Sequence, residues 1–522
     1  MRSLLEASGP QPPQVAAQAY EREVAPGATS GANGTRSVTL ARSSAVLVLA
    51  ATAAALAGCT LGPGYQRPPV AAPDQFYGLA GQAQAASLAD LPWWAVFEDP
   101  ALKTLIEEAL KNGYDLRLAS ARVEEARARY GIAGSAFYPQ VGYQGQFARE
   151  RFSGFQPGAP AHGASADVVT ANVNASWEID LWGRIRRSTE AAKAQYLATE
   201  EARRGVVLAL VSEVASAYFD LRQLDEDLEI ARRTTGAFHE TYDLFNRQLQ
   251  GGVASGLQTS DAEAAWANVA ALVPALESQI AAKENQLALL LGRSPGPIAR
   301  GAALFAQPLR ADVPAGLPAA LLLRRPDLRQ AEQQLVAANA GIGVAEAAFF
   351  PAISLTGLFG GLSPDLRQLL SKGQTWTIAA GLTGPIFQGG RLRAQVRVAM
   401  AQFEQAKLQY EQAVTNAFGE VSTSLIALQK LAAAEQERQR AVNAYREAVR
   451  LSLLRYNSGL SAYFEVIDAQ ENLLSTENGL AQTRHDRLVA LVNLYKALGG
   501  GWQVEEAARP TAPAGSTPAS SP

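Results

Sequence analysis

The sequence predicts a mostly α-helical chain that also carries membrane β-strands, and three observations lead to this fold class. A unit of about 190 residues occurs twice along the chain. Each copy contains two segments in which apolar and polar residues alternate, as in strands with one apolar and one polar face. Each copy then continues into a very long amphipathic helix. No run of 18 apolar residues follows residue 58, so we expect no transmembrane helix in the remaining chain.

The internal repeat is visible as two pairs of similar segments. AFYPQVGYQGQF at 136–147 resembles AFFPAISLTGLF at 348–359, an offset of 212, and GRIR at 183–186 resembles GRLR at 390–393, an offset of 207. Because the offset differs between the two pairs, the two copies of the repeat must differ in length. This difference falls in the loops between the paired segments. We therefore assign repeat 1 to residues 100–292, a linker to 293–320 and repeat 2 to 321–500.

The first element of repeat 1 is predicted as a helix over residues 100–134. Asp99 is a suitable N-cap, and Pro100 suits the first helical turn. Apolar residues then recur on one helical face: Leu102, Leu105, Ile106, Ala109 and Leu110.

Two strands follow in each copy. In the segment 168–181 the side chains that share the apolar face are Val169, Ala171, Val173, Ala175, Trp177, Ile179 and Leu181. The preceding strand has Val141, Tyr143 and Phe147 on that face, and repeat 2 has Ile353, Leu355 and Phe359, then Trp376, Ile378 and Leu382. Strands of this kind suit either a transmembrane barrel with a wet lumen or a soluble antiparallel sheet with one wet face. The alternation alone leaves both readings open, and the lipobox described below, which implies export, favours the barrel.

After the strands, a long helix is predicted from Arg184 to Gln250, with an apolar seam at heptad spacing that favours left-handed coiled-coil packing. At 1.5 Å per residue it would extend about 100 Å. The glycine-rich turn at 251–257 reverses the chain into a second helix over 259–291, and the segment 457–464 does the same in repeat 2.

Four strands cannot close a barrel in lipid without unpaired edges, so transmembrane strands would require oligomerisation. Three chains would supply 3 × 4 = 12 strands, enough for an aqueous channel.

The N-terminal region has the features of an export signal. Residues 45–57 form an uncharged apolar stretch behind Arg36 and Arg42, and Leu-Ala-Gly-Cys matches the lipobox of bacterial lipoproteins. We therefore expect residues 1–58 to be a cleaved signal peptide, and its unusually long leader indicates a misassigned translation start, with Val38 as an alternative initiator. Cys59, the only cysteine, would carry a covalent lipid, and 59–99 would form a lipid-anchored segment. Residues 501–522 are predicted as a disordered tail.

Composition argues against several other functions. The net charge of −3 gives no basic surface for nucleic acid, and one cysteine with three scattered histidines offers few metal ligands. No nucleophile elbow, phosphate-binding loop or dinucleotide motif is present. We expect no enzymatic activity, no metal and no cofactor apart from the lipid.

The chain resembles the TolC-type outer membrane efflux proteins, in particular the NodT-like lipoprotein branch that serves RND-type tripartite pumps. The resemblance spans residues 59–500 and rests on CTLGPGYQRP (59–68), PWWAVFEDPAL (92–102), SWEIDLWGRIRR (176–187), LLLRRPDLRQAE (321–332) and GPIFQGGRLRAQ (384–395). It implies a homotrimer with a 12-stranded β-barrel in the outer membrane, four strands from each chain, continued by a periplasmic α-helical coiled-coil barrel with 293–320 at its equator.

The resemblance also implies two functional sites. The helix–turn–helix tips would contact a periplasmic adaptor (membrane fusion protein), through Gly252, Val253, Ser255, Gly256 and Leu257 and through Ser458, Gly459, Leu460 and Ser461. The alternative is that these glycines only permit tight turns. Acidic residues beyond the second tip, Glu465 and Asp468, would narrow the periplasmic aperture; the alternative is a solvated helix face. Repeat 1 has Gln258 and Asp261 at the matching positions.

The function implied is a passive exit duct for toxic compounds or drugs that an inner-membrane pump and its adaptor deliver. One rival is the duct of a type I protein secretion system. A rival of another class is an exported coiled-coil scaffold lipoprotein with a soluble sheet. The sequence does not identify the transported compounds, since a wide polar lumen discriminates little between different compounds.

Overall fold

The computed structural model describes residues 60–70, 72–78, 86–152, 164–309, 314–369 and 371–500. The predicted signal peptide, the lipidation site Cys59 and the predicted tail 501–522 therefore lie outside the described residues. No helix in the described ranges is both long enough and apolar enough to cross a membrane.

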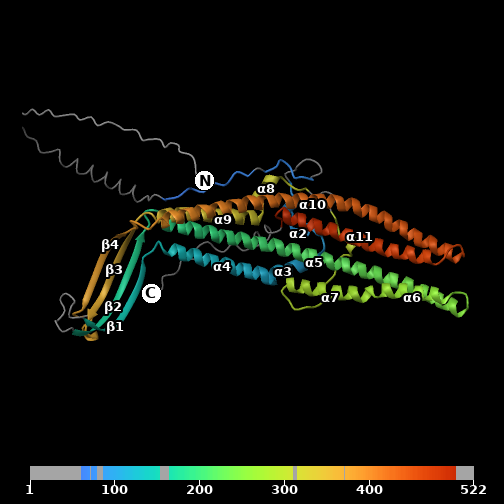
Figure 1. The fold of residues 1–522 in the computed structure, drawn as a ribbon, viewed down its shortest axis with the longest axis horizontal. Helices are drawn as coiled ribbons and strands as arrows, with labels where there is room; N and C mark the ends of the chain where they lie inside the picture. Colours follow the sequence, from blue (N-terminus) through green and yellow to red (C-terminus); the bar gives the residue numbers. More distant parts are fainter. Residues whose placement is uncertain are drawn as a thin grey trace, which may run out of the picture. The chain divides into compact units, whose positions relative to one another are not determined.

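The same order of elements appears twice along the chain (Figure 1). Repeat 1 contains α3 (Pro100–Asn112), α4 (Tyr114–Ser135), β1 (Gln140–Phe152), β2 (Ala164–Ile179), α5 (Arg184–Gln250), α6 (Gly256–Ala270) and α7 (Leu272–Leu290). Repeat 2 contains α8 (Pro318–Arg324), α9 (Pro326–Ala347), β3 (Ala352–Ser363), β4 (Gln374–Thr383), α10 (Arg391–Asn457) and α11 (Phe464–Ala497). Short helices η1 (Leu88–Asp90), α2 (Trp93–Val96), η2 (Leu304–Ala306) and η3 (Leu366–Gln368) lie in the connections. Both long helices, α5 and α10, have 67 residues.

The prediction of one helix over 100–134 was wrong, because the helix is interrupted at Gly113. Asp99 does cap α3, accepting hydrogen bonds from the backbone N–H groups of Ala101 and Leu102, and Pro100 is its first residue. Gly113 then adopts an extended backbone, with φ −54° and ψ 130°. A Cβ at this position would lie 2.5 Å from the carbonyl oxygen of Ala109, so only glycine fits the break.

The helix predicted over 259–291 also differs from the structure. It begins earlier, at Gly256, because Ser255 caps it and Gln258 completes a capping box. It is divided into α6 and α7 at Ala271, three residues before Pro274. Proline has no N–H to donate to the carbonyl group of residue 270, so the helical hydrogen bonding fails there.

The four predicted strands form one antiparallel sheet in the order β1-β2-β3-β4. The register places Tyr143, Val173, Phe359 and Trp376 in a single row across all four strands, and each of these side chains is more than half exposed. The adjacent row on the other face begins with Gln144 opposite Asn172. The predicted apolar and polar faces are therefore confirmed. In the described chain β1 and β4 are edge strands, each paired on one side only.

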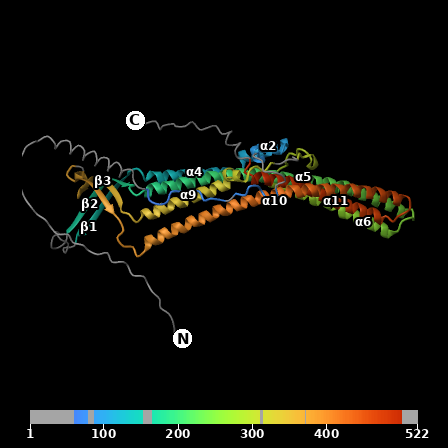
Figure 2. The same ribbon diagram turned by 90° about the horizontal axis from the view of Figure 1, so that it is seen from above.

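The main apolar core lies around the middle of α5, where α3, α7 and α11 pack against it. Residues of the predicted seam such as Val207, Val214 and Leu221 are fully buried there, and the seam continues to Phe245. Towards the end of the helix it weakens, since Leu249 is exposed. Figures 1 and 2 both show α5, α10 and α11 running together towards the two helix–turn–helix tips.

Candidate functional site

The tip of repeat 1 is a tight turn with a defined hydrogen-bond pattern. After the last helical residue of α5, Gly252 adopts φ 70°. Its N–H donates to the carbonyl of Leu249 at 3.0 Å, and the N–H of Val253 donates to that of Gln248 at 2.8 Å. This is the Schellman arrangement, in which a left-handed residue satisfies the free carbonyl groups at the end of a helix. Gly252 is therefore required by the turn, whereas Gly256 is already the first residue of α6.

The tip of repeat 2 ends α10 in the same way. Gly459 has φ 69°, its N–H donates to the carbonyl of Tyr456 at 2.9 Å, and the N–H of Leu460 donates to that of Arg455 at 2.9 Å. The next helix starts differently. The position of Ser255 is occupied by Ala462, and α11 has no side-chain cap. Among the residues that the structure describes, the buried hydroxyl oxygen of Ser461 has no hydrogen-bond partner.

Both tips project apolar side chains into solvent. Val253 is 81% exposed and its counterpart Leu460 is 71% exposed. Leu257 and Phe464, which match each other at the offset of 207, are exposed to a similar degree. Large apolar side chains that stand out at the end of a helical hairpin are typical of a contact surface for another protein. Leu257 is among the tip residues predicted from the sequence, whereas Phe464 is not.

The two predicted aperture carboxylates lie in the first turns of α11 and are both exposed. Glu465 forms a 3.5 Å ion pair with Arg455 at the end of α10. The carboxylate of Asp468 contacts no cationic side chain among the described residues, and its backbone carbonyl accepts a hydrogen bond from Asn472. The spacing of three residues places both carboxylates on one face of the helix. In the isolated chain this face is solvated.

Just behind the tips, two tyrosines of repeat 2 contact α5, and these contacts are not predicted from the sequence. The hydroxyl of Tyr463 donates a hydrogen bond to the hydroxyl of Thr241, and its ring packs edge-on against Phe245 at 4.6 Å between centroids. Burial raises the pKa of Tyr463 to about 12, so it remains a donor at neutral pH. The hydroxyl of Tyr456 contacts the side-chain oxygen of Gln248 at 3.4 Å. These two contacts, which we name the tip latch, join the second hairpin to α5.

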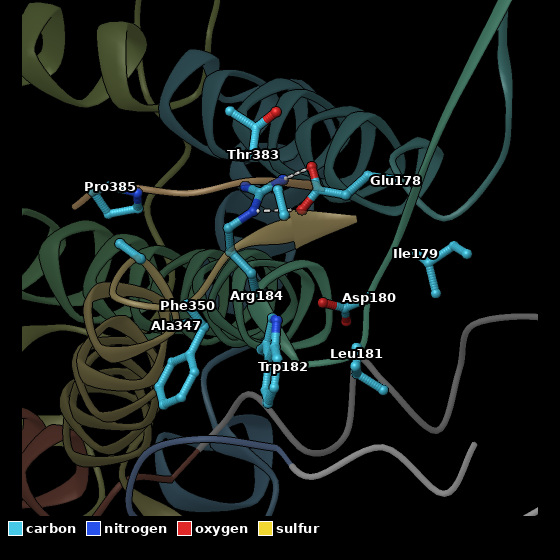
Figure 3. Close-up of a pocket in the computed structure, with 12 residues that line it drawn as sticks. Glu178, Ile179, Asp180, Leu181, Trp182, Arg184, Ala347, Phe350, Thr383 and Pro385 are labelled. Atoms are coloured by element: carbon cyan, nitrogen blue, oxygen red, sulfur yellow. Dashed lines mark hydrogen bonds and ion pairs between the residues drawn. The ribbon is translucent and has the colours of Figure 1, made fainter. Parts of the chain in front are cut away.

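The motif SWEIDLWGRIRR forms the corner between β2 and α5, and its polar side chains stabilise this corner. Arg184 forms two hydrogen bonds with Glu178, at 2.9 and 2.7 Å, and both line a cavity shown in Figure 3. Asp180 accepts from the backbone N–H groups of residues 185 and 186 and thereby caps α5. The indole N–H of Trp182 donates to the carbonyl of Pro351 at 2.8 Å, which ties this corner to the start of β3.

An extended segment, residues 60–70, packs against this corner and is called the strap below. Gly183 has φ 79°, and a Cβ there would lie 2.9 Å from the Cα of Thr60. The guanidinium of Arg187 donates to the carbonyls of residues 61 and 62. Further along, Arg67 forms a bidentate ion pair with Glu332 of α9. The strap therefore joins α5 to α9.

No cluster of three or more histidine, cysteine, aspartate or glutamate side chains suited to a metal ion occurs among the described residues.

Comparison with known proteins places these features in a family. A profile described as "Outer membrane efflux protein" matches residues 105–293 and 317–500. The probable efflux pump outer membrane protein TtgC of Pseudomonas putida is 38% identical over 463 residues, covering 88% of this chain and 96% of that protein. The cation efflux system protein CusC of Escherichia coli is 36% identical over 457 residues, covering 86% and 97%.

Solved structures agree with these relatives. The open state of the Neisseria gonorrhoeae MtrE outer membrane channel matches with a TM-score of 0.73 and 33% identity, covering 85% of this chain and 99% of that one. The predicted fold class, the outer-membrane location and the channel function are thereby confirmed. Since the profile matches most of the chain and the relatives match over nearly their full length, this chain belongs to the outer membrane efflux protein family.

Proposed function

We propose that three copies of this chain form the outer-membrane exit duct of a tripartite efflux system. The observation that carries the proposal is the four-stranded sheet with two open edges, β1 and β4, at one end of two long helical hairpins. Pairing β4 of one copy with β1 of the next closes a barrel of 3 × 4 = 12 strands and leaves no unpaired edge in lipid.

The faces of the sheet determine which side meets lipid. The exposed row of Tyr143, Val173, Phe359 and Trp376 faces the acyl chains, and the row with Gln144 and Asn172 lines an aqueous lumen. The helices continue this lumen through the periplasm to the tips. Transport needs no enzymatic step in this chain, because the upstream pump supplies the driving force.

The tips are the surface for the periplasmic adaptor, which joins the duct to an inner-membrane RND-type pump. Their exposed apolar residues, Val253 and Leu257 on one hairpin and Leu460 on the other, support this assignment. The transported cargo is small toxic compounds or drugs. Relatives of this chain are named for efflux of toluene, antibiotics and cations.

At the periplasmic end, Glu465 and Asp468 form the aperture. Threefold symmetry places 2 × 3 = 6 carboxylates around the axis, where they attract cations and repel one another. The tip latch holds the second hairpin, and with it the two carboxylates, against α5.

The lipid on Cys59 is an additional anchor. Thr60, the next residue, packs on Gly183 where the strand β2 becomes the helix α5, so the anchor leaves the protein at the junction between barrel and helices. A lipid attached there reaches the inner leaflet of the outer membrane. Mass spectrometry of the mature chain tests this: Cys59→Ala should lose the acyl mass and the cleavage before residue 59.

Single-channel conductance in planar bilayers tests the duct and its aperture. Wild-type trimers should conduct, and Mg²⁺ on the periplasmic side should block them. The double variant Glu465→Gln, Asp468→Asn should need about tenfold more Mg²⁺ for half-block, because the carboxylates no longer attract the cation. Asp261→Asn, at the matching position of repeat 1, is the control and should leave the block unchanged. An unchanged block in the double variant would remove the aperture assignment.

A further inference from the structure

We propose that Arg149 and Arg151 form a binding site for the phosphate groups of lipopolysaccharide, the glycolipid of the outer leaflet of the outer membrane. The inference rests on the proposed duct and adds a lipid ligand to its barrel. Both residues lie near the end of β1 that is remote from the helices, since β1 begins at Gln140, directly after α4. The site is therefore at the cell-surface rim of the barrel.

Both arginines belong to the face of the sheet that meets lipid in the proposed barrel. The pairing of β1 with β2 is regular over all 13 residues of β1, without a bulge. Side chains therefore alternate between the two faces along the whole strand. Arg149 and Arg151 share the face of Phe147, whereas Glu150 between them belongs to the lumen face.

An uncharged band on the lipid face ends just before the arginines. Its periplasmic limit is the row in which Ile179 pairs with Ile353, and its outer limit is the row in which Val169 pairs with Phe147. These rows are ten residues apart on β2. Ten residues span about 34 Å along a strand, or about 26 Å along the axis of a barrel with strands tilted by about 40°. Because the apolar band of a transmembrane barrel is about 25 Å tall, Arg149, one row beyond, lies at the level of the lipid headgroups.

The protein itself neutralises this positive charge only weakly. Nε of Arg149 lies 3.6 Å from a carboxylate oxygen of Asp167 on β2, and the two side chains are 75% and 41% exposed. An exposed ion pair of this kind contributes at most about 1 kcal/mol, so a phosphate group can displace the carboxylate. Arg151 is exposed and forms no ion pair with any residue that the structure describes. Both guanidinium groups therefore have N–H donors available for an external acceptor.

The spacing and the chemistry of the two side chains suit phosphate. Alternate residues of a strand are about 7 Å apart, so both guanidinium groups can contact one phosphate or two neighbouring phosphates. The planar guanidinium group binds phosphate oxygens through two parallel hydrogen bonds, which a carboxylate-free lipid surface of sugars alone would not offer. Lipopolysaccharide carries its lipid phosphates where the acyl chains join the sugars, which is the depth at which Arg149 lies.

Closure of the barrel adds a further cation at this rim. The strand β1 is an edge strand, and the proposed trimer pairs it with β4 of the next copy. Because β4 begins at Gln374, the turn before it, with the exposed Lys372, lies at the same end of the barrel. The lipid face of β3 is uncharged at this end, where it carries Gly361 and Ser363. The cations therefore gather where two copies meet, and we expect three sites per trimer.

Binding of purified lipopolysaccharide to full-length trimers in detergent tests the site. Native mass spectrometry should show up to three bound molecules per wild-type trimer. Lipopolysaccharide from which the lipid phosphates have been removed should bind at least about tenfold more weakly, and so should intact lipopolysaccharide to the double variant Arg149→Gln, Arg151→Gln. A factor of ten corresponds to the loss of about one charge-assisted hydrogen bond.

The matched control is Arg129→Gln. Arg129 is 76% exposed and pairs with Glu125, much as Arg149 pairs with Asp167, but it lies on the periplasmic helix α4. This variant loses the same charge from an equally exposed position, and it should bind lipopolysaccharide like wild type.

The variant Asp167→Asn separates binding from a structural role. It removes a negative charge that competes with phosphate for Arg149, so the affinity for lipopolysaccharide should rise about threefold. If the ion pair served only to stabilise the sheet, Asp167→Asn and the double arginine variant would instead change binding in the same direction, and the proposal would be wrong. Because this variant keeps both arginines, it also decides the question if the double variant fails to assemble.

Three other results would overturn the proposal. The first is equal affinity of the double variant and the wild type, and the second is equal binding of phosphatidylglycerol, which would indicate a general anion site. The third is loss of the trimer in lipid-free detergent when both arginines are replaced, which would indicate that they bind the next copy and not a lipid.

Conductance in planar bilayers separates this inference from the proposed function. The double variant should conduct like wild type, because both arginines lie on the lipid face. If wild-type trimers conduct but the double variant binds lipopolysaccharide like wild type, the lipid site is wrong and the duct stands. If wild-type trimers do not conduct, the duct itself is wrong.

Discussion

Replacing Tyr218 by phenylalanine should loosen the buried contact that joins α3, α5 and the segment after α7. Tyr218 is fully buried on α5, and its hydroxyl donates to Asp99 at 2.9 Å. The same hydroxyl accepts from the N–H of Gly301 at 2.9 Å. Asp99 also accepts from the side chain of Gln307 at 2.6 Å. One oxygen atom of Tyr218 thus links three parts of the chain.

The cost of the substitution follows from these two hydrogen bonds. Phenylalanine removes a bond to a charged acceptor, worth about 1.5–3 kcal/mol, and leaves the N–H of Gly301 without its acceptor, at about 1–3 kcal/mol. Burial raises the pKa of Asp99, but the hydrogen bonds from Gln307 and Tyr218 more than offset this and hold the pKa below its usual value. The carboxylate is therefore ionised at neutral pH. We expect a loss of about 4 kcal/mol in local stability.

Native-state hydrogen exchange of the trimer in detergent measures this loss, because it reports local opening without global unfolding. The amides of Gly301 and Leu102 should exchange about a thousandfold faster in Tyr218→Phe, since about 1.4 kcal/mol corresponds to a factor of ten. Amides of α9, away from this contact, should be unaffected.

The control is Tyr410→Phe. Tyr410 is also buried, but its hydroxyl makes no hydrogen bond within the described residues, so the same chemical change should have little effect. An acceleration of less than about fivefold in Tyr218→Phe, or an equal effect in both variants, would refute the assignment of this contact as the link between α3 and α5.

Three further predictions concern pH and the strap. Burial raises the pKa of the Asp227 carboxyl to about 6, so its protonated form favours the folded state at acidic pH. This contribution to the free energy of unfolding, at most about 3 kcal/mol, is present below about pH 4 and is lost as pH rises through about 6. Asp227→Asn should therefore flatten the pH dependence of the melting temperature. Gly183→Ala should release the strap, because of the positive φ and the contact with Thr60, so limited proteolysis should cut within 60–70 while wild type resists. Glu332→Gln weakens the ion pair with Arg67, whose side chain is 43% exposed, and should raise the same cleavage rate less than about fivefold; a larger effect than that of Gly183→Ala would reverse our ranking of the two contacts.

Several elements could be predicted from local sequence alone. The bounds of α5, Arg184 to Gln250, agree with the prediction, because a heptad seam of this length has no competing interpretation. The strand faces were also correct, since alternation with a period of two assigns each side chain to one face. The two helix–turn–helix tips were predicted from glycine-containing turns that separate segments with helical periodicity.

The errors also have local causes. The break at Gly113 was missed because the apolar positions continue on both sides of it, although Asn-Gly is itself a turn signal. The division at Ala271 is signalled by Pro274, whose missing N–H interrupts the helical hydrogen bonds although the apolar pattern continues across it. Both errors concern where a helix is interrupted, which periodicity does not report.

The candidate site was predicted only in part. Asp99 was predicted as a helix cap, and it caps α3. Its contact with Gln307 was not predicted, because the two residues are 208 positions apart in the sequence. The partner of Tyr463 lies 222 positions away, and nothing in the local pattern names it. Arg455, which pairs with Glu465 across the second tip, was also not identified.

The sequence by itself determined the repeat, the alternating strands, the long helices and the tips, because each depends on side chains that are close together along the chain. The tertiary structure decided which helix faces which, and so it alone brought Thr241 and Glu332 to their partners. The physical reason is that apolar burial is non-directional and assigns a face but no partner. Hydrogen bonds and ion pairs are directional, and they can be located only after the helices have packed.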